Sequence, residues 1–413
     1  MALLQRYRVL DFTDDRGLLA GRILADLGAD VVQVEPVTGS SARTAEPMGA
    51  HGSYFWDTYA ANKRGIAVDF DDAQSRAHLD DLIAQADVVI ESAGPGGMES
   101  LGLGFDKLHV RHPRLIYVSI SAFGSTGPKA RYAASDLAVW AAGGPLDPHR
   151  EGDRPPVRIS IPQAFLHAAA DAADGALFAL LARERSGRGQ HVDVSAQACL
   201  GTATLGRVLA HTAGDVAPEW EKLVDGPAKK MDQSGSGSGT DPAKKKWICV
   251  DGLIEFHLSV GPASGAFTTA FFEWMAAENE EYAEYAAIDW RTVPEMAARG
   301  EFDSTRLDEA RSAVARFLAG KTKNEVLEAA RERRLLCVPV YDTGDVVSSP
   351  QLGARGFYST VSDAAGRQIR LPGAFAKITG ETLSVRTAAP TLGQHTDEVL
   401  GEWVGDRAME NAS

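Results

Sequence analysis

The sequence lacks the features that mark several large classes of protein. It has three cysteines, Cys199, Cys249 and Cys337, which are too few and too far apart for a disulfide framework or a cysteine metal site. We expect reduced, buried thiols. No apolar run reaches the roughly 18 residues of a membrane-spanning helix, and the first residues show no secretory signal pattern. A soluble cytoplasmic protein is expected.

Positive charge is also in short supply. Lysine and arginine number 42 against 56 aspartates and glutamates, which gives a net charge of −14. Nucleic acids and anionic membranes bind to basic faces. Neither is therefore expected as a main partner, although a local basic pocket for a phosphate group stays open. The ten histidines show no metal-ligand spacing, and no metal site is predicted.

What the sequence does contain is a regular alternation of strand and helix patterns up to residue 125. Helical periodicity predicts helices at 17–28 and 74–86. Short apolar runs predict strands at 7–12, 30–35, 65–70, 87–92 and 114–121. Such alternation predicts an α/β fold with a mostly parallel sheet, whose ligands bind at the carboxyl ends of the strands.

Further along, a long apolar helix is predicted at 161–183, followed by a strand at 191–195 and a helix at 197–214. Residues 212–246 are rich in glycine, serine and lysine, which predicts a flexible surface loop. The pattern restarts at residue 247. The expected division is a large domain at 1–211, the loop at 212–246, a small domain at 247–345 and a return segment to the large domain at 346–413.

The small domain is predicted to be an α/β lobe. Its expected elements are strands at 246–252 and 337–343 and helices at 265–277 and 305–336, the last broken at Gly320. The return segment predicts short antiparallel strands at 357–363, 367–373 and 376–380. A final helix follows, with Thr396 as its N-cap and acidic residues in its first turn.

Two glycine-rich loops follow predicted strands, at 91–104 and 121–128. Glycine lets backbone N–H groups approach an anion closely, and a following helix N-terminus favours negative charge. Neither loop has the Gly-Lys-Ser/Thr of a phosphate-binding loop or the GxGxxG pattern. Each loop is therefore either a ligand loop or an ordinary tight turn.

Two pairs of acidic residues are candidates for acid–base chemistry. Asp14 and Asp15, next to Arg16, end the first strand, where they are either acid–base groups or a solvated turn. Asp171 and Asp174 lie three residues apart on the long helix. They either share a pocket, contact a partner chain or form part of a solvated stripe.

Taken together, ordered segments across residues 8–400 resemble the family III coenzyme A transferases, which include formyl-CoA and carnitine CoA-transferases and α-methylacyl-CoA racemases. The matching segments are RVLDF, LADLGADVVQVEP, NKRGIAVDF, ADVVIESAGPGGMESLGLGFDKL, PRLIYVSISAFGSTGP, PPVRISIP, SGRGQHVDVS, PVYDTGDVVSSPQLGARGFYSTV and PTLGQHTDEVL. The resemblance implies a Rossmann-like large domain, a smaller α/β lobe and two chains interlocked as rings. It also implies an aspartate that attacks an acyl-CoA thioester and passes through a mixed anhydride and an aspartyl thioester.

The sequence departs from this family at the residues that carry the chemistry. Counting back from Gln190, the aspartate position falls on Phe165, or on Ala164 in a register shifted by one residue. Neither side chain can attack a thioester. Asp171 lies roughly 9 Å further along the helix at 1.5 Å per residue, so it is a poor substitute.

The coenzyme A loop is altered as well. Relatives often have asparagine and arginine where this chain has Ser92 and Ser100, and a lysine near the nucleotide where it has Asp71. Losing cations weakens contacts to phosphate. The loop residues that the resemblance assigns to coenzyme A are Ser92, Ala93, Gly94, Pro95, Gly96, Met98 and Ser100.

The sequence therefore resembles a nucleophile-free subunit, of the kind found in succinyl-CoA:benzylsuccinate CoA-transferases of anaerobic toluene breakdown. The expected partner is a homologous chain that carries the aspartate. The complex would move coenzyme A from a diacid thioester such as succinyl-CoA to another carboxylic acid, without a tightly bound cofactor. Two alternatives stay open: an independent acyl-CoA lyase or isomerase that uses Asp14, Asp15 or Asp171, and a non-enzymatic binding homodimer.

Overall fold

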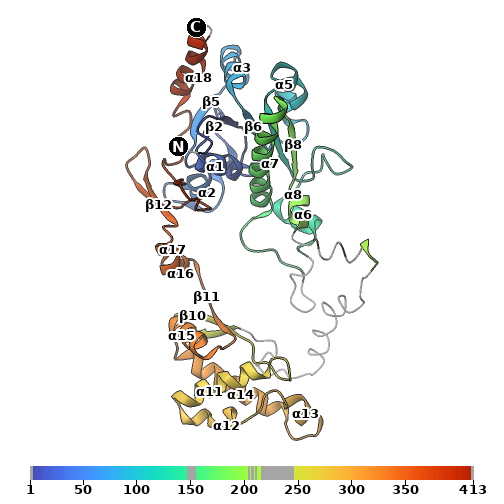
Figure 1. Ribbon diagram of the computed structural model, residues 1–413, viewed down its shortest axis with the longest axis vertical. Coiled ribbons are helices and arrows are strands. Elements are labelled where there is room, and N and C mark those ends of the chain that lie inside the picture. Colours follow the sequence, from blue (N-terminus) through green and yellow to red (C-terminus); the bar gives the residue numbers. More distant parts are fainter. Residues whose placement is uncertain are drawn as a thin grey trace. The chain divides into compact units, whose positions relative to one another are not determined.

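The chain divides into two compact units. The computed structural model describes residues 3–146, 155–202, 205, 209, 212–214 and 246–410, with side chains up to residue 405. One unit comprises Met1–Asp225 and Ala354–Ser413, and the other comprises Gly226–Gly353 (Figure 1). Nearly all of the predicted loop at 212–246 lies outside the described residues, so its flexibility and the domain boundaries around it stay predictions.

A six-stranded sheet forms the centre of the first unit, with the strand order β5-β2-β1-β6-β7-β8. Every neighbouring pair is parallel. The strands are β1 (Arg8–Asp11), β2 (Asp30–Pro36), β5 (Arg64–Val68), β6 (Val88–Glu91), β7 (Ile116–Ser121) and β8 (His191–Ser195). β6 and β7 are buried at every position, as expected for parallel strands covered on both faces. The predicted parallel sheet is confirmed.

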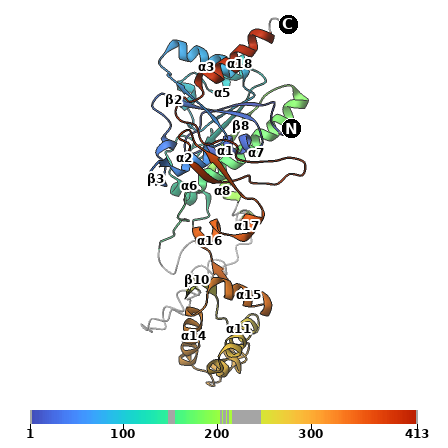
Figure 2. The same ribbon diagram turned by 90° about the vertical axis from the view of Figure 1, so that its left-hand side faces the viewer.

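Helices cover both faces of this sheet (Figure 2). The core on one face joins Val88, Ile116 and Val118 to α1 (Leu18–Asp26), α6 (Asp136–Gly143), α7 (Ala164–Ser186) and α8 (Ala196–Thr202). The core on the other face joins Val89 and Tyr117 to α3 (Ala73–Gln85), α4 (Gly97–Ser100), α5 (Phe105–Arg111) and α18 (Thr396–Glu410). Because strand side chains alternate, neighbouring residues of one strand belong to different cores.

The long helix α7 packs through small side chains. Seven alanines of this helix are buried, at 164, 168, 169, 172, 173, 176 and 179, and their spacing of three to four residues places them on one helix face. Small residues let the helix axis lie close to the sheet and to α1. By length and composition α7 is also apolar enough to cross a membrane, with 44% of its most apolar window buried. Its alanine face is that of a core helix.

The second unit has its own core. Its sheet has the order β11-β10-β9, with antiparallel pairs among β9 (Lys246–Cys249), β10 (Gly252–Phe256) and β11 (Cys337–Val340). Aromatic rings fill the space beneath it: Phe256 stacks on Phe271 at 3.9 Å between ring centroids, and Phe272 stacks on Trp290 at 5.0 Å. The surrounding helices are α11 (Gly265–Glu278), α12 (Ala283–Ala286), α13 (Val293–Ala298), α14 (Ser304–Ala319) and α15 (Lys323–Arg333).

The predicted helix pair broken at Gly320 is confirmed by α14 and α15. Thr322 starts α15 with a capping box: its hydroxyl accepts a hydrogen bond from the Glu325 N–H, and the Glu325 carboxylate accepts one from the Thr322 N–H. The remaining elements are η1 (Ser41–Thr44), β3 (Met48–Gly49), β4 (Gly52–Ser53), α2 (Tyr54–Tyr59), η2 (Glu280–Tyr282), α16 (Thr343–Val347), α17 (Pro350–Ala354), β12 (Tyr358–Ser362) and β13 (Gln368–Pro372).

Two local predictions for the return segment are wrong. Residues 376–380 form no strand but a single bridge between Ile378 and Glu381, which closes a turn through Gly380 at φ +87°. Thr396 is the first residue of α18 rather than its N-cap. Its hydroxyl donates to the Gly393 carbonyl and accepts from the Ala67 N–H, so it ties the helix to β5. The predicted antiparallel pair is confirmed as β12 and β13.

Candidate functional site

The carboxyl end of β1 is held by a buried ion pair. Lys63 Nζ lies 2.7 Å from Asp11 Oδ2 and 2.9 Å from Gln33 Oε1, and it also donates to the Leu18 carbonyl. Both charged side chains are fully buried. Asp11 also accepts hydrogen bonds from the N–H and the hydroxyl of Thr13, in the loop that follows. The network links β1 and β2 to the residue that precedes β5, and it fixes where that loop begins. Sequence reasoning missed it.

Asp14 joins the loop after β1 to the loop after β6. Its N–H donates to Ser92 Oγ at 3.0 Å, and Ser92 Oγ donates to Asp14 Oδ1 at 2.8 Å. Arg16 donates to the same carboxylate, at 2.5 Å for the closest contact. Burial acts to raise the pKa of Asp14, but Arg16 and Ser92 outweigh it and lower this pKa below its usual range. Asp14 is therefore a positioned, ionised group rather than a proton acceptor poised near neutral pH.

The glycine loop after β6 turns sharply and leads into α4. Gly94 and Gly96 have φ of +76° and +93°, a region that favours glycine. The Glu91 carboxylate accepts the Ala93 N–H at 2.7 Å, and the Glu99 carboxylate accepts the Gly96 N–H at 2.9 Å. Two loop N–H groups are therefore already bonded to the loop's own carboxylates.

The seven loop residues that the sequence analysis singled out do not share one environment. Ser92 and Met98 are buried, so these two shape the loop from within, whereas Ala93 is exposed. Gly94, Pro95 and Gly96 lie at the surface, and the hydroxyl of the exposed Ser100 donates to the Gly97 carbonyl. Among the seven residues, those that a ligand could contact directly are Ala93, Gly94, Pro95, Gly96 and Ser100.

Cations that the sequence analysis did not consider surround this loop. Arg76, from the first turn of α3, donates to the Leu101 carbonyl at 2.7 Å. A Cβ on Gly102 would lie 2.8 Å from Lys107 Nζ and 3.9 Å from the Arg76 guanidinium, and a Cβ on Gly96 would lie 4.0 Å from that of Arg131. The loop is therefore less depleted of positive charge than Ser100 and Asp71 alone suggest.

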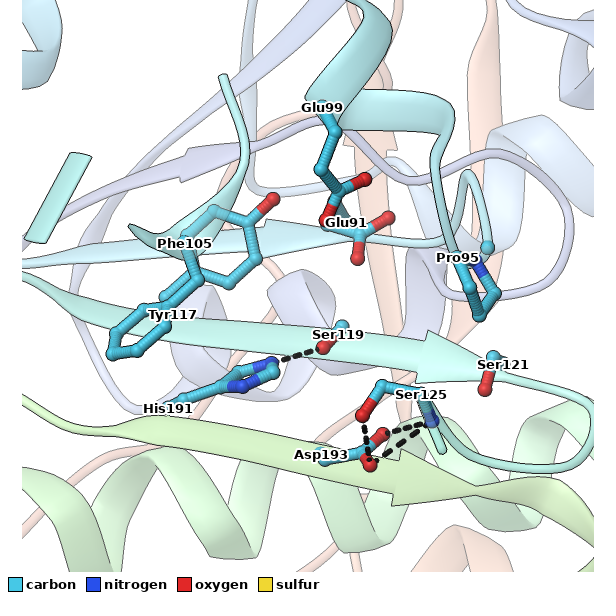
Figure 3. A pocket seen from close by; sticks show the side chains of 11 residues that line it. Glu91, Pro95, Glu99, Phe105, Tyr117, Ser119, Ser121, Ser125, His191 and Asp193 are labelled. Carbon is cyan, nitrogen blue, oxygen red and sulfur yellow. Dashed lines mark hydrogen bonds between the residues drawn. The ribbon is translucent and has the colours of Figure 1, made fainter. Parts of the chain in front are cut away.

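A cavity opens beside the loop, at the carboxyl end of β6 and along β7 and β8 (Figure 3). Its lining is Glu91, Gly94, Pro95, Glu99, Phe105, Tyr117, Ser119, Ser121, Ser125, His191 and Asp193. Burial, followed by the nearby negative charges of Glu99 and Asp14, raises the pKa of Glu91 to about 7. Burial, followed by the negative charges of Glu91 and Glu99, also raises the pKa of Tyr117. Sequence reasoning missed this cavity because its residues come from four separate segments.

Aromatic rings form one wall of the cavity. Phe105 stacks on His191 with 4.8 Å between centroids and on His109 with 4.9 Å. His191 Nε2 lies 2.5 Å from Ser119 Oγ. On the opposite side, the carboxylate of Asp193 accepts hydrogen bonds from the backbone and the hydroxyl of Ser125.

The amino end of α7 is apolar where a nucleophile is expected. Ala164 is fully buried, and Phe165 packs against the core beneath the sheet. A carboxylate does lie here, but it is that of Asp136, which accepts the Ala164 N–H at 2.7 Å. Arg158 Nε lies 3.6 Å from the other oxygen of Asp136. Asp136 thus acts as a helix cap donated by α6, a role that sequence reasoning missed.

The two acidic residues further along α7 belong neither to the cavity nor to the amino end of the helix. Asp171 is exposed and neighbours Cys199 of α8, whose pKa is raised to about 12, first by burial and then by this carboxylate. Asp174 is exposed as well. Asp15 accepts a hydrogen bond from Ser41 at the surface. No group of three His, Cys, Asp or Glu side chains among the described residues is placed to hold a metal ion.

Comparisons with known proteins indicate one family over nearly the whole chain. The family model described as CoA-transferase family III matches residues 4–396. The "Succinyl-CoA:(R)-benzylsuccinate CoA-transferase subunit BbsE" of Thauera aromatica is 32% identical, over 96% of this chain and 93% of the relative. The "Formyl-CoA:oxalate CoA-transferase" of Streptomyces avermitilis is 28% identical, over 98% of this chain and 97% of the relative.

Solved structures share the fold. A CAIB/BAIF family protein from Brucella suis superimposes with a TM-score of 0.71 at 24% identity, over 96% of this chain and 98% of the other. The Rv3272 protein of Mycobacterium tuberculosis superimposes with a TM-score of 0.68 at 24% identity, over 97% and 99% of the two chains. The predicted α/β fold class is confirmed by these neighbours together with the parallel sheet.

Proposed function

We propose, from the premise that this chain belongs to CoA-transferase family III, that it is a subunit without its own nucleophile in a two-chain CoA-transferase. The observation that carries the proposal is Phe165 in the first turn of α7. A phenyl ring has no lone pair with which to attack a thioester carbonyl, so neither an acyl anhydride nor an aspartyl thioester can form at this position. The carboxylate at this end of the helix, that of Asp136, accepts the Ala164 N–H of the helix it caps.

The partner in this proposal is a homologous chain with aspartate at the start of its long helix. The name of the Thauera aromatica relative describes a subunit, which supports an assembly of more than one kind of chain. We propose an interlocked dimer, in which this chain completes the shape of the partner's acid-binding pocket. The exposed side chains of Phe178 and Leu181 on α7 are apolar surface that such a partner would cover.

The proposed reaction moves coenzyme A from a diacid thioester such as succinyl-CoA to another carboxylic acid such as benzylsuccinate. Succinyl-CoA appears in the names of several relatives, including a D-citramalate and a mesaconate transferase. Arg131 and Lys107 beside the glycine loop are candidates for contacting the phosphates of a coenzyme A bound to Gly94, Pro95 and Gly96. No tightly bound cofactor is part of the proposal, and a cytoplasmic location fits such a substrate.

The test is to purify this chain alone, the aspartate-bearing homologue alone and the two together, and to assay coenzyme A transfer from succinyl-CoA to benzylsuccinate. We expect turnover only from the mixture. Incubation with radiolabelled succinyl-CoA should label the homologue and leave this chain unlabelled after denaturation. The Phe165→Ala variant should leave the turnover of the complex within a few-fold, because the ring takes no part in the bond changes.

Three results would overturn the proposal. Covalent acyl label on this chain would show that it has a nucleophile of its own. Turnover of an acyl-CoA by the chain alone that is lost in Asp14→Asn, Asp15→Asn or Asp171→Asn would favour an independent lyase or isomerase. A stable homodimer that neither turns over acyl-CoA nor joins any aspartate-bearing homologue would favour a binding protein.

A further inference from the structure

The cavity of Figure 3 is lined by three carboxylates and by no cation. Glu91, Glu99 and Asp193 come from the end of β6, from α4 and from β8. Each accepts hydrogen bonds from neighbouring N–H or O–H groups, but none of the three has an ion-pair partner among the described residues. The neighbouring Arg16 is already paired with Asp14. Like charges gathered in a partly buried site are unfavourable unless a cation or a proton offsets them.

Tyr117 adds a second and independent feature. The side chain is 3% exposed, and its hydroxyl has no hydrogen-bond partner among the described residues. In Figure 3 this hydroxyl points toward the carboxylates of Glu99 and Glu91. A buried hydroxyl without a partner costs free energy of folding, so the group is set to accept or donate a hydrogen bond within the cavity.

We propose that this cavity binds a small primary ammonium ion, held by Glu91, Glu99 and the Tyr117 hydroxyl. An ammonium group has three N–H donors and one positive charge, and these three side chains offer oxygen acceptors from different directions. The rings of Phe105, Tyr117 and His191 form the wall beside them, where a cation and its alkyl carbon are both favoured. A metal ion is a poorer match, because no metal-binding geometry occurs among the described residues.

The size of the cavity limits the ligand. Its volume of about 40 Å³ holds only a few atoms, since one water needs roughly 10–15 Å³ on this measure. A methylammonium ion fits this limit. A quaternary ammonium is bulkier and has no N–H to donate to the carboxylates.

Binding should depend on pH through Glu91. Its pKa of about 7 follows from burial and from the negative charges of Glu99 and Asp14, against the positive charge of Arg16. Tyr117 on β7 and His191 and Asp193 on β8 face the same cavity. Because a cation favours the ionised carboxylate, affinity should be about tenfold weaker at pH 6 than at pH 8. The bound ion would link the glycine loop to β7, whether or not this chain is catalytically silent.

The experiment is a titration of the full chain with methylammonium chloride, followed by saturation-transfer NMR of the methyl signal. Sodium chloride and tetramethylammonium chloride at equal ionic strength serve as comparison salts. We expect saturable binding of methylammonium at pH 8, displaced by neither salt and about tenfold weaker at pH 6. Glu91→Gln should abolish binding, and Tyr117→Phe should weaken it several-fold. The exposed Glu273→Gln, in the other unit, should leave it unchanged.

Each alternative outcome overturns the proposal. Absence of saturable binding by the wild-type chain at pH 8 would do so directly. Equal competition by tetramethylammonium or sodium would show general attraction to an acidic surface. Binding that survives both Glu91→Gln and Tyr117→Phe, in variants whose near-ultraviolet circular dichroism matches the wild type, would place the ion elsewhere. None of these readouts involves coenzyme A transfer, so they leave the proposed function untouched.

Discussion

The two sides of the sheet differ sharply at its carboxyl edge. On the α5 side, the end of β6 is surrounded by charged and polar groups: Glu91, Glu99 and Asp193 in the cavity, and Arg76 and Lys107 near Gly102. On the α7 side, the first turn of the long helix presents Ala164 and Phe165, and the carboxylate that meets its Ala164 N–H is the cap Asp136. Charged and polar side chains thus gather on one side, whereas the first turn of α7 on the other side is apolar. One edge of a sheet can therefore carry a polar cavity on one face and an apolar helix start on the other.

The largest effect on stability is expected from removing the buried ion pair at the end of β1. Lys63→Met leaves the buried Asp11 carboxylate without its cation, which should destabilise the chain by about 3–5 kcal/mol. Urea unfolding followed by circular dichroism measures this change. Arg111→Met removes one partner of the exposed pair with Asp80 and should cost no more than about 1 kcal/mol. Equal losses of unfolding free energy in the two variants would show that the buried ion pair contributes no more to stability than the exposed one.

The next largest effect is the dependence of folding stability on pH that Glu91 causes. Glu91 has a folded pKa of about 7, above its usual value, because burial disfavours its charge. Between pH 4.5 and about 7, Glu91 therefore keeps a proton in the folded state that it has lost in the unfolded state. The contribution of this carboxyl group to the free energy of unfolding is complete below pH 4.5. It falls by up to about 3 kcal/mol as pH rises to about 7.

Glu91→Gln should remove this component and make the chain more stable than the wild type above pH 7. Unfolding free energies measured from pH 4.5 to 8.5 for the two proteins test it. The conclusion fails if both proteins show the same pH slope.

The smallest expected effect concerns the apolar side. Asp136→Ala removes the cap of α7 and should cost about 1–2 kcal/mol. Asp136→Asn keeps an oxygen acceptor for the Ala164 N–H and should recover most of this loss. Denaturant midpoints of the three proteins provide the measurement. If Asp136→Ala were instead neutral for stability and abolished coenzyme A transfer by the complex, Asp136 would have a chemical role and the comparison above would not hold.

Much of the fold could be predicted from the sequence because its signals are local. Near-continuous apolar runs such as Ile116–Ser121 predict buried parallel strands, and the apolar segment before Gly187 predicts α7. The predictions failed where tertiary contacts decide. Thr396 is drawn to the edge of β5 instead of capping its own helix, and residues 376–380 meet no neighbouring strand among the described residues.

The candidate site could be predicted only in part. The glycine loop and the phenylalanine at the start of the long helix are visible in the sequence, because each lies within one segment. That Phe165 occupies the nucleophile position stays a prediction. The cavity could not be predicted: Glu91, Tyr117 and His191 are brought together by strand order, and β8 follows β7 in space only after a long intervening segment. The cap that Asp136 provides for α7 is hidden for the same reason, since its partner lies 28 residues away.

The parallel sheet, the family and the phenylalanine at the start of the long helix follow from the amino-acid sequence alone, because they depend on residue type and on short-range periodicity. Which carboxylates share a cavity, which acid caps α7 and which lysine pairs with Asp11 become visible once the chain is folded. Those outcomes depend on distances between atoms far apart in the chain, and burial then sets how strongly each charge is felt.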